Sequence, residues 1–351
     1  MKQIIKTLSW EKDKLKIIDQ TLLPEKEEYI ELCTIEDVFD AIKTLKIRGA
    51  PALGIAASYG ILLSVKKAKI KDKEMFFNIL EKSSHYISGC RPTAYNLFYG
   101  VKRLNNIALR NRHLSPEKII KKMEQECRKI FNEDIKSSIS IARNGNTIIK
   151  SGMRILTHCN AGGLATSGIG TALAPIYLAA EKHKNIEVFV DETRPILQGA
   201  RLTMWELKKA GINCTLICDN MAGFLMQQKR IDMVITGADR IAKNGDTANK
   251  IGTYSIAVLA RFHRIPFYIA APLSSFDFSI QSGNEIPVEQ RNKEEITHIK
   301  GIRVAPEDVN VYNPAFDITP GRLISGFITE KGIFSYRDIA SLTEYRGRGN
   351  L

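Results

Sequence analysis

The sequence lacks the features of several common protein classes. None of its 351 residues form an apolar run near the ~20 residues needed to span a membrane. Its six cysteines include no C-x-x-C pair. The closest two, Cys214 and Cys218, lie in an apolar segment with no histidine nearby, which argues against a zinc site. Widely spaced cysteines in a chain of this length indicate reduced thiols rather than a disulfide framework.

Low-complexity linkers, internal repeats and clear targeting signals are absent too. The apolar start is interrupted by Trp10, Glu11 and Lys12, so it is a poor signal peptide. Together with the reduced thiols, this predicts a cytoplasmic protein with no membrane partner. The net charge is +13, but most lysines and arginines alternate with acids, as on the exposed face of an amphipathic helix. The densest basic stretch, 64–74, has no interleaved aromatic residues, so we expect no nucleic-acid partner.

The first third of the chain has the spacing of helices. Residues 35–45 and 51–68 have apolar positions at helical intervals, and Pro51 suits the first turn of the second helix. Residues 116–145 form one or two long amphipathic helices that end near Gly145. We therefore expect residues 1–125 to form a smaller helix-rich N-terminal domain with a short β-structured start.

From about residue 150, short apolar strands alternate with helices. This alternation predicts right-handed crossovers and a parallel sheet. The predicted fold class is α/β: a Rossmann-like, doubly wound parallel-sheet domain in residues 126–351, preceded by the smaller helix-rich domain. The expected strands cover 153–159, 186–192, 212–219, 232–239 and 265–272, and the expected helices cover 167–182, 197–211, 222–231 and 252–264.

Polar stretches follow four of these strands, at 158–160, 191–194, 219–220 and 237–239. In open parallel sheets the ligand crevice lies beyond the carboxyl ends of the strands. We therefore place the functional site at this edge of the sheet. The first stretch opens the segment THCNAGGLATSG (157–168), whose small residues and expected helix start could receive an anion.

Cys159 and Asp239 are the candidate catalytic residues. A cysteine is more often a small buried hydrophobe, which is our interpretation of Cys33, Cys127, Cys214 and Cys218. Cys159 differs because it lies at the mouth of a loop where thiolate chemistry is accessible. A carboxylate such as Asp239 on an apolar strand is costly unless it is paired or functional. An N-cap or a salt bridge with Arg240 is the structural alternative.

Further residues could bind a phosphorylated substrate. Arg48, with the amides of Gly49 and Ala50, precedes the helix at Pro51, and Arg91 stands beside Pro92; guanidinium groups and helix-terminal amides bind phosphate well. Each of these residues could instead be solvated on the surface. Three others lie at or near expected helix starts, where they could contact a sugar hydroxyl or a phosphate: Gln198, Asn249 and Lys250.

Several segments resemble the methylthioribose-1-phosphate isomerase family, which is related in fold to regulatory subunits of eukaryotic initiation factor 2B. The match covers nearly the whole chain, so coincidence is not credible. The matching segments are DQTLLP (19–24), RGAPALGIAA (48–57), RPTAYNLF (91–98), LTHCNAGGLAT (156–166), VDETRPILQGARLTMWEL (190–207), TGADRIAKNGDTANKIGTY (236–254), PFYIAAP (266–272), IPVEQR (286–291) and NPAFDITPGRLISGFITEKG (313–332).

The resemblance implies roles for particular residues. Cys159 and Asp239 occupy the positions of the family's catalytic pair. The family's substrate contacts fall on Arg48, Gly49, Ala50, Arg91, Gln198, Asn249 and Lys250. The implied reaction converts 5-methylthioribose-1-phosphate, an aldose phosphate, to its ketose isomer in methionine salvage. The resemblance further implies a homodimer with a small-molecule sugar-phosphate substrate and neither a metal nor an organic cofactor.

Other functions share these motifs. A 5-deoxyribose-1-phosphate isomerase would differ only in the substituent at C5 of its substrate. A ribose-1,5-bisphosphate isomerase would need a second phosphate site, which the matched segments do not supply. A non-catalytic subunit of the initiation-factor type would have no need of Cys159, Asp239, Arg48, Arg91 and Lys250 as a set.

Overall fold

The computed structural model describes residues 5–91 and 93–342, which group into two compact units. The first unit contains residues up to Ile139 together with Gly163–Gly170, and the second contains Ser140–Gly162 and the residues from Thr171 onward. Residues 126–139 and 163–170, which the sequence analysis assigned to the second domain, therefore group with the first unit. No helix in the described parts of the chain is long and apolar enough to cross a membrane.

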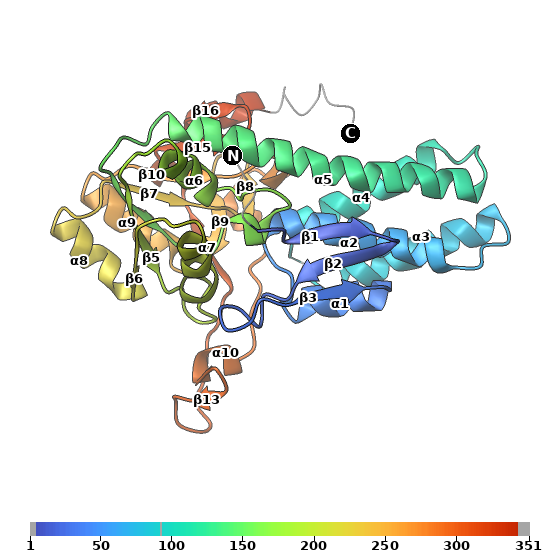
Figure 1. The fold of residues 1–351 in the computed structure, drawn as a ribbon, viewed down its shortest axis with the longest axis horizontal. Coiled ribbons are helices and arrows are strands. Elements are labelled where there is room, and N and C mark those ends of the chain that lie inside the picture. Colours follow the sequence, from blue (N-terminus) through green and yellow to red (C-terminus); the bar gives the residue numbers. More distant parts are fainter. Residues whose placement is uncertain (1–4, 92, 343–351) are drawn as a thin grey trace. The chain divides into compact units, whose positions relative to one another are not determined.

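The first unit has a short antiparallel sheet followed by helices (Figure 1). Strand β2 alternates buried and partly buried residues, as a strand with one covered face should. Helix α1 begins at a capping box, in which the Thr34 hydroxyl and the Asp37 carboxylate each accept a backbone N–H of the other residue. The elements are β1 Leu8–Glu11, β2 Lys14–Ile18, β3 Tyr29–Leu32, α1 Ile35–Lys43, α2 Ala50–Lys67, α3 Lys73–Ser88, α4 Tyr95–Arg110 and α5 Pro116–Asn146.

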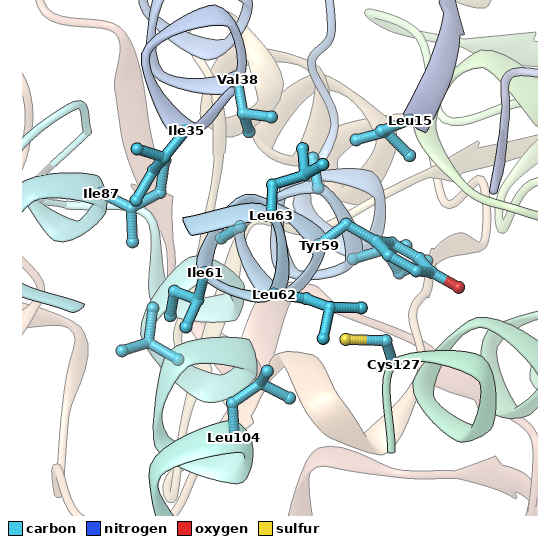
Figure 2. Packing of buried hydrophobic residues seen from close by; sticks show 14 of the residues in the cluster. Leu15, Ile35, Val38, Tyr59, Ile61, Leu62, Leu63, Ile87, Leu104 and Cys127 are labelled. Atoms are coloured by element: carbon cyan, nitrogen blue, oxygen red, sulfur yellow. The ribbon is translucent and has the colours of Figure 1, made fainter. Parts of the chain in front are cut away.

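Helix α2 is the centre of the first unit's core. It is apolar on all sides, and nearly all of its residues are buried, as expected for a helix surrounded by other elements. Helices α2 and α4 approach closely where both have glycine: a Cβ on Gly100 would lie 2.3 Å from the Gly54 carbonyl oxygen. Figure 2 shows the side chains of α2 surrounded by residues from five other elements, namely Leu15, Ile35, Val38, Ile87, Leu104 and Cys127.

The second unit is built on a seven-stranded sheet with the order β16-β15-β10-β7-β4-β5-β6. All neighbours are parallel except β15 and β16, so this is an α/β fold with a mixed sheet. Numbered along the chain, the parallel strands lie in the order 3-2-1-4-5-6. The order reverses between β4 and β7, and a ligand crevice is expected beyond the carboxyl ends of strands at such a point.

The strands of this sheet are β4 Arg154–Thr157, β5 Glu187–Asp191, β6 Cys214–Ile217, β7 Met233–Thr236, β10 Phe267–Ala270, β15 Gly326–Thr329 and β16 Gly332–Phe334. A second sheet, in the order β11-β8-β9-β14, comprises β8 Arg240–Ala242, β9 Thr247–Lys250, β11 Phe276–Asp277 and β14 Phe316–Thr319. A short hairpin pairs β12 His298–Ile299 with β13 Ile302–Arg303. The helices are α6 Leu173–Glu181, α7 Met204–Lys209, α8 Ala222–Gln227, α9 Thr253–Phe262 and α10 Glu294–Thr297.

Two predicted helices begin differently in the structure. The helix expected from residue 167 begins at Leu173. The hydroxyl of Thr166 accepts the amides of Gly168 and Gly170, and such local bonds compete with the helical pattern. The helix expected from residue 197 begins as a π-helical turn, Gly199–Thr203, before α7.

Candidate active site

Cys159 lies just beyond β4 in a constrained backbone conformation. Its φ is 63°, in the left-handed region that residues with a side chain rarely adopt. Its amide donates a hydrogen bond to Thr193 Oγ1 at 2.8 Å, and its carbonyl accepts one from Thr203 Oγ1 at 2.5 Å. Strained backbone of this kind persists only where surrounding bonds hold it, and it is concentrated at functional sites. Two threonines therefore fix the position from which the Cys159 side chain projects.

The segment after β5 is tied to the segment after β6. The carboxylate of Asp219 accepts the amides of Thr193 and Arg194, each at 2.7 Å. Thr193 Oγ1 in turn donates to the carbonyl of Asp191 at 3.0 Å. Because β4, β5 and β6 are neighbours in one sheet, these bonds join three consecutive strand ends.

His158 is buried between two of the strand ends and the β9–α9 turn. Its Nδ1 lies 3.0 Å from Asp191 Oδ2, and its Nε2 lies 2.9 Å from the carbonyl oxygen of Ile251. Burial alone would lower the pKa of His158, but the bond to Asp191 and the attraction of Asp191 and Asp219 outweigh it and raise the pKa. Burial raises the pKa of Asp191 as well, against the opposing effect of His158.

A second buried carboxylate supports the loop after Cys159. Glu206 of α7 is inaccessible to solvent; it accepts hydrogen bonds from Asn160 Nδ2 at 2.8 Å and from the Tyr177 hydroxyl at 2.9 Å. A Cβ on Gly162 would lie 2.3 Å from a Glu206 oxygen, so only glycine fits there. The loop is therefore packed directly against the carboxyl group of Glu206.

Asp239 lies at the other side of the point where the strand order reverses. It follows β7, is half-buried, and its amide donates to the carbonyl of Ala248 at 2.9 Å. Strand β7 pairs with β4 in parallel, so Asp239 and Cys159 leave the sheet at the same edge. The guanidinium of Arg240 pairs with Asp277.

Asn249 and Lys250 are the last two residues of β9. Both are buried. Asn249 Nδ2 donates to Thr253 Oγ1 at 2.9 Å, and the Lys250 ammonium lies 5.1 Å from the centre of the Phe316 ring, a cation–π distance. Helix α9 begins at Thr253, so Lys250 does lie close to a helix start, as predicted.

Gln198 immediately precedes the π-helical turn and is buried. Its carboxamide oxygen has no hydrogen-bond partner among the described residues. Thr236 Oγ1, at the end of β7, and Asp191 Oδ1, at the end of β5, are likewise buried without partners there. Buried polar atoms are normally satisfied. Gln198 and the ends of β5 and β7 therefore carry buried polar atoms whose hydrogen bonds a ligand or a water could complete.

The remaining predicted binding residues lie in the first unit. Gly49 is the N-cap of α2 with φ 95°, and Ala50 is the first helical residue. A Cβ on Gly49 would lie 2.5 Å from Ala165 Cα, so glycine is required there. Arg48 precedes this turn and is half-buried. Arg91 is half-buried just before α4; its neighbour Pro92, which the sequence analysis invoked, lies outside the described residues.

The anion-binding role predicted for Ser167 is not supported by its contacts. Its amide donates to Asp134 Oδ2 at 2.6 Å, and its hydroxyl donates to the same oxygen at 2.7 Å. Both donors are therefore used inside the first unit. The prediction of a bound anion does not hold at Ser167, because the carboxylate of Asp134 on α5 already accepts both of its donors.

His158, Asp191 and Asp219 lie in stretches that the sequence predicts at the site, but the contacts of these residues were not predicted. The support that Thr193, Thr203 and Glu206 give to the Cys159 loop was not predicted either. The usable signal was their position, since polar side chains at the carboxyl ends of parallel strands gather at one edge.

Known proteins are similar to this chain over most of its length. The model of the initiation factor 2 subunit family matches residues 46–336. Methylthioribose-1-phosphate isomerase of Acetivibrio thermocellus is 55% identical, covering 95% of this chain and 97% of the relative. The enzyme of the same name from Geotalea uraniireducens is 52% identical, covering 93% and 95%.

Two solved structures are similar over 97% of this chain. One is 5-methylthioribose 1-phosphate isomerase from Pyrococcus horikoshii, with a TM-score of 0.89, 42% identity and 96% of that chain covered. The other is the translation initiation factor eIF-2B subunit delta from A. fulgidus, with a TM-score of 0.83, 41% identity and 99% of that chain covered.

The chain belongs to the initiation factor 2 subunit family. Within that family its resemblance is to the methylthioribose-1-phosphate isomerases, and the curated relatives at 52–55% identity confirm the resemblance.

Proposed function

We propose that the chain is an aldose–ketose isomerase that converts 5-methylthioribose-1-phosphate to 5-methylthioribulose-1-phosphate in methionine salvage. The observation that carries this proposal is the joint placement of Cys159 and Asp239 at the point where the strand order reverses. The names of the curated relatives support the same reaction.

The chemistry suits these residues. A glycosyl phosphate does not open spontaneously, so the ring oxygen must be protonated before its bond to C1 breaks. Asp239 supplies that proton. The hydrogen on C2 then moves to C1 while the C2 hydroxyl gives its proton to the Asp239 carboxylate left by the first step, and C2 becomes the ketone carbon. The hydrogen moves either directly as a hydride, or by loss of a proton to Cys159 and reprotonation at C1.

Binding residues hold the substrate during these steps. Lys250 carries its charge at the end of β9 and suits the phosphate. The unsatisfied oxygen of Gln198 suits a sugar hydroxyl, and Asn249, the residue before Lys250, follows the family pattern. Arg48, Gly49, Ala50 and Arg91 remain predicted substrate-binding residues of the first unit.

A non-catalytic initiation-factor subunit is the second candidate function. The similarity to the subunit from A. fulgidus, at 41% identity, favours it. A regulatory subunit has no evident need for a strained Cys159 held by two threonines, so we rank the isomerase first.

The test measures whether the protein converts each of three purified substrates: 5-methylthioribose-1-phosphate, 5-deoxyribose-1-phosphate and ribose-1-phosphate. Conversion is monitored as the loss of the anomeric proton signal. Strong preference for the methylthio compound is expected. Equal or better use of the deoxyribose compound would reassign the substrate. No conversion of any of the three by the folded protein would favour the non-catalytic subunit.

We further propose that the second unit is a Rossmann-like, doubly wound domain, that the first is a smaller helix-rich domain, and that the protein is a cytoplasmic homodimer. All six cysteines are free, which suits a reducing compartment. Exposed apolar side chains on the contacting helices α8 and α9 suit a subunit interface: Met221 beside α8, Phe224 on it, and Tyr254, Val258 and Phe262 on α9. Mass measurement in solution, with Phe224→Ser and Phe262→Ser as disrupting variants, tests the dimer.

A further inference from the structure

His158 connects two segments that carry separate parts of the proposed chemistry. It immediately precedes Cys159, and its Nε2 lies 2.9 Å from the carbonyl of Ile251, the residue after Lys250. The end of β4 and the end of β9 belong to different sheets, so backbone pairing between strands does not join them. The imidazole ring provides a direct link.

The protons of this link follow from its partners. A backbone carbonyl can only accept, so Nε2 of His158 carries a proton. The other nitrogen, Nδ1, faces Asp191 Oδ2 at 3.0 Å, with one proton between them. A ring nitrogen of His158 and one carboxylate oxygen each of Asp191 and Asp219 lie within 4.8 Å of one another, and the two carboxylates favour the doubly protonated ring.

The ring is also packed against the second segment. Gly252 has φ 105°, and a Cβ there would lie 2.9 Å from Cε1 of His158. Asp317 accepts the amide of Gly252 at 2.7 Å, which holds the turn against the ring. A side chain at residue 252 would therefore displace the ring or the turn.

We infer that His158 is a positioning residue of this site: it holds the Cys159 segment and the Lys250–Gly252 segment in a fixed relation through one hydrogen bond from each ring nitrogen. This inference rests on the proposed function for its kinetic consequences. It adds a positioning role to the proposed reaction, because Cys159 and Lys250 can act on one substrate only if their two segments keep a fixed relation.

The kinetic test uses three variants of His158. The carboxamide of His158→Asn can reach Asp191, that of His158→Gln can reach the Ile251 carbonyl, and His158→Phe keeps neither bond. We expect kcat to fall ~10²-fold in His158→Phe and ~10-fold in each carboxamide variant, since small misplacements of reacting groups are costly. His85→Asn and His85→Phe, at an exposed position on α3, are the matched controls and should retain wild-type kcat. Equal loss in all three His158 variants, or no loss, would overturn the inference.

Hydrogen exchange measured by mass spectrometry tests the inference without a substrate. We expect faster exchange in His158→Asn at residues 249–254 and in His158→Gln at residues 158–162, with β10 unchanged in both. Uniform acceleration across the second unit would mean that His158 only stabilises the fold. If the wild-type protein converts no substrate while the exchange result holds, the proposed function fails and the coupling stands.

Discussion

Cys127 in the first unit and Cys159 in the second have very different surroundings. Cys127 is completely buried among the apolar side chains around α2 (Figure 2). Burial raises the pKa of its thiol well above the ordinary value, so it stays protonated and unreactive. Cys159 is half-buried, with its backbone held by two threonine hydroxyls. Apolar packing makes one region stable, and hydrogen bonding positions reactive groups in the other.

The largest expected effect follows from removing the proposed acid. Asp239→Asn should lower kcat by ~10²-fold or more while the fold survives, because the amide cannot donate the proton needed to open the ring. Steady-state rates and circular dichroism check both parts. Asp308→Asn, an exposed carboxyl of the second unit, is the control. Near wild-type turnover by Asp239→Asn would exclude this residue from the mechanism.

A substitution in the core of the first unit should lower stability and leave kcat unchanged. Leu62 is fully buried on α2, so Leu62→Ala should lower the free energy of unfolding by about 2–5 kcal/mol, with kcat retained under conditions where the protein is folded. Denaturant titration measures the change. Leu109→Ala, at an exposed position on α4, should change the free energy of unfolding little. Loss of kcat in folded Leu62→Ala would contradict the conclusion that the core around α2 contributes stability and not catalysis.

The threonines that hold Cys159 should lie between these extremes. Thr193→Val and Thr203→Val keep the side-chain shape but remove one hydrogen bond each to the Cys159 backbone. We expect kcat to fall on the order of 10-fold in each, through misplacement of the thiol. Thr215→Val, exposed on β6, is the matched control. If both buried variants keep full kcat, the strained backbone of Cys159 has no catalytic importance.

A further prediction concerns Asp134, the half-buried carboxyl of α5 that binds Ser167. Burial raises its pKa to about 6, against the opposing hydrogen bonds from Ser167. Because the folded state holds this proton more tightly than the unfolded state, the contribution to stability is full below pH ~4 and is lost as the pH rises through ~6. Asp134→Asn cannot ionise. The wild-type free energy of unfolding, relative to this variant, should therefore fall by about 2–3 kcal/mol from pH 4 to 7.

Unfolding titrations at several pH values measure this difference. Asp40→Asn, an exposed position on α1, should show a much smaller pH dependence relative to wild type. A wild-type advantage over Asp134→Asn that stays constant with pH would show that Asp134 keeps one protonation state throughout.

Much of the second unit could be predicted from its sequence. The five predicted strands are present because short apolar runs separated by helices favour parallel pairing. The short strand β9 was missed, because Thr247–Lys250 is buried yet mostly polar and has no apolar alternation. The unit boundary after Ile139 lies within α5, which continues through it without a break, so no local sequence signal marks it.

Part of the site could be predicted because its residues follow recognisable apolar strands. Cys159 and Asp239 follow apolar strands, so their positions at one edge could be expected. The contact of His158 with Ile251 joins residues 93 positions apart, and no local pattern predicts such a contact. The pairing of Arg240 with Asp277, 37 positions further along the chain, is likewise set by tertiary structure.

The measurement that tests the account most directly is turnover of 5-methylthioribose-1-phosphate by two matched cysteine variants, followed by proton NMR. The account predicts that Cys159→Ser lowers kcat by ~10²-fold or more, whereas Cys127→Ser loses stability and keeps its kcat when folded. Comparable turnover by folded Cys159→Ser and wild type would contradict the central claim that the strand-end thiol takes part in the reaction.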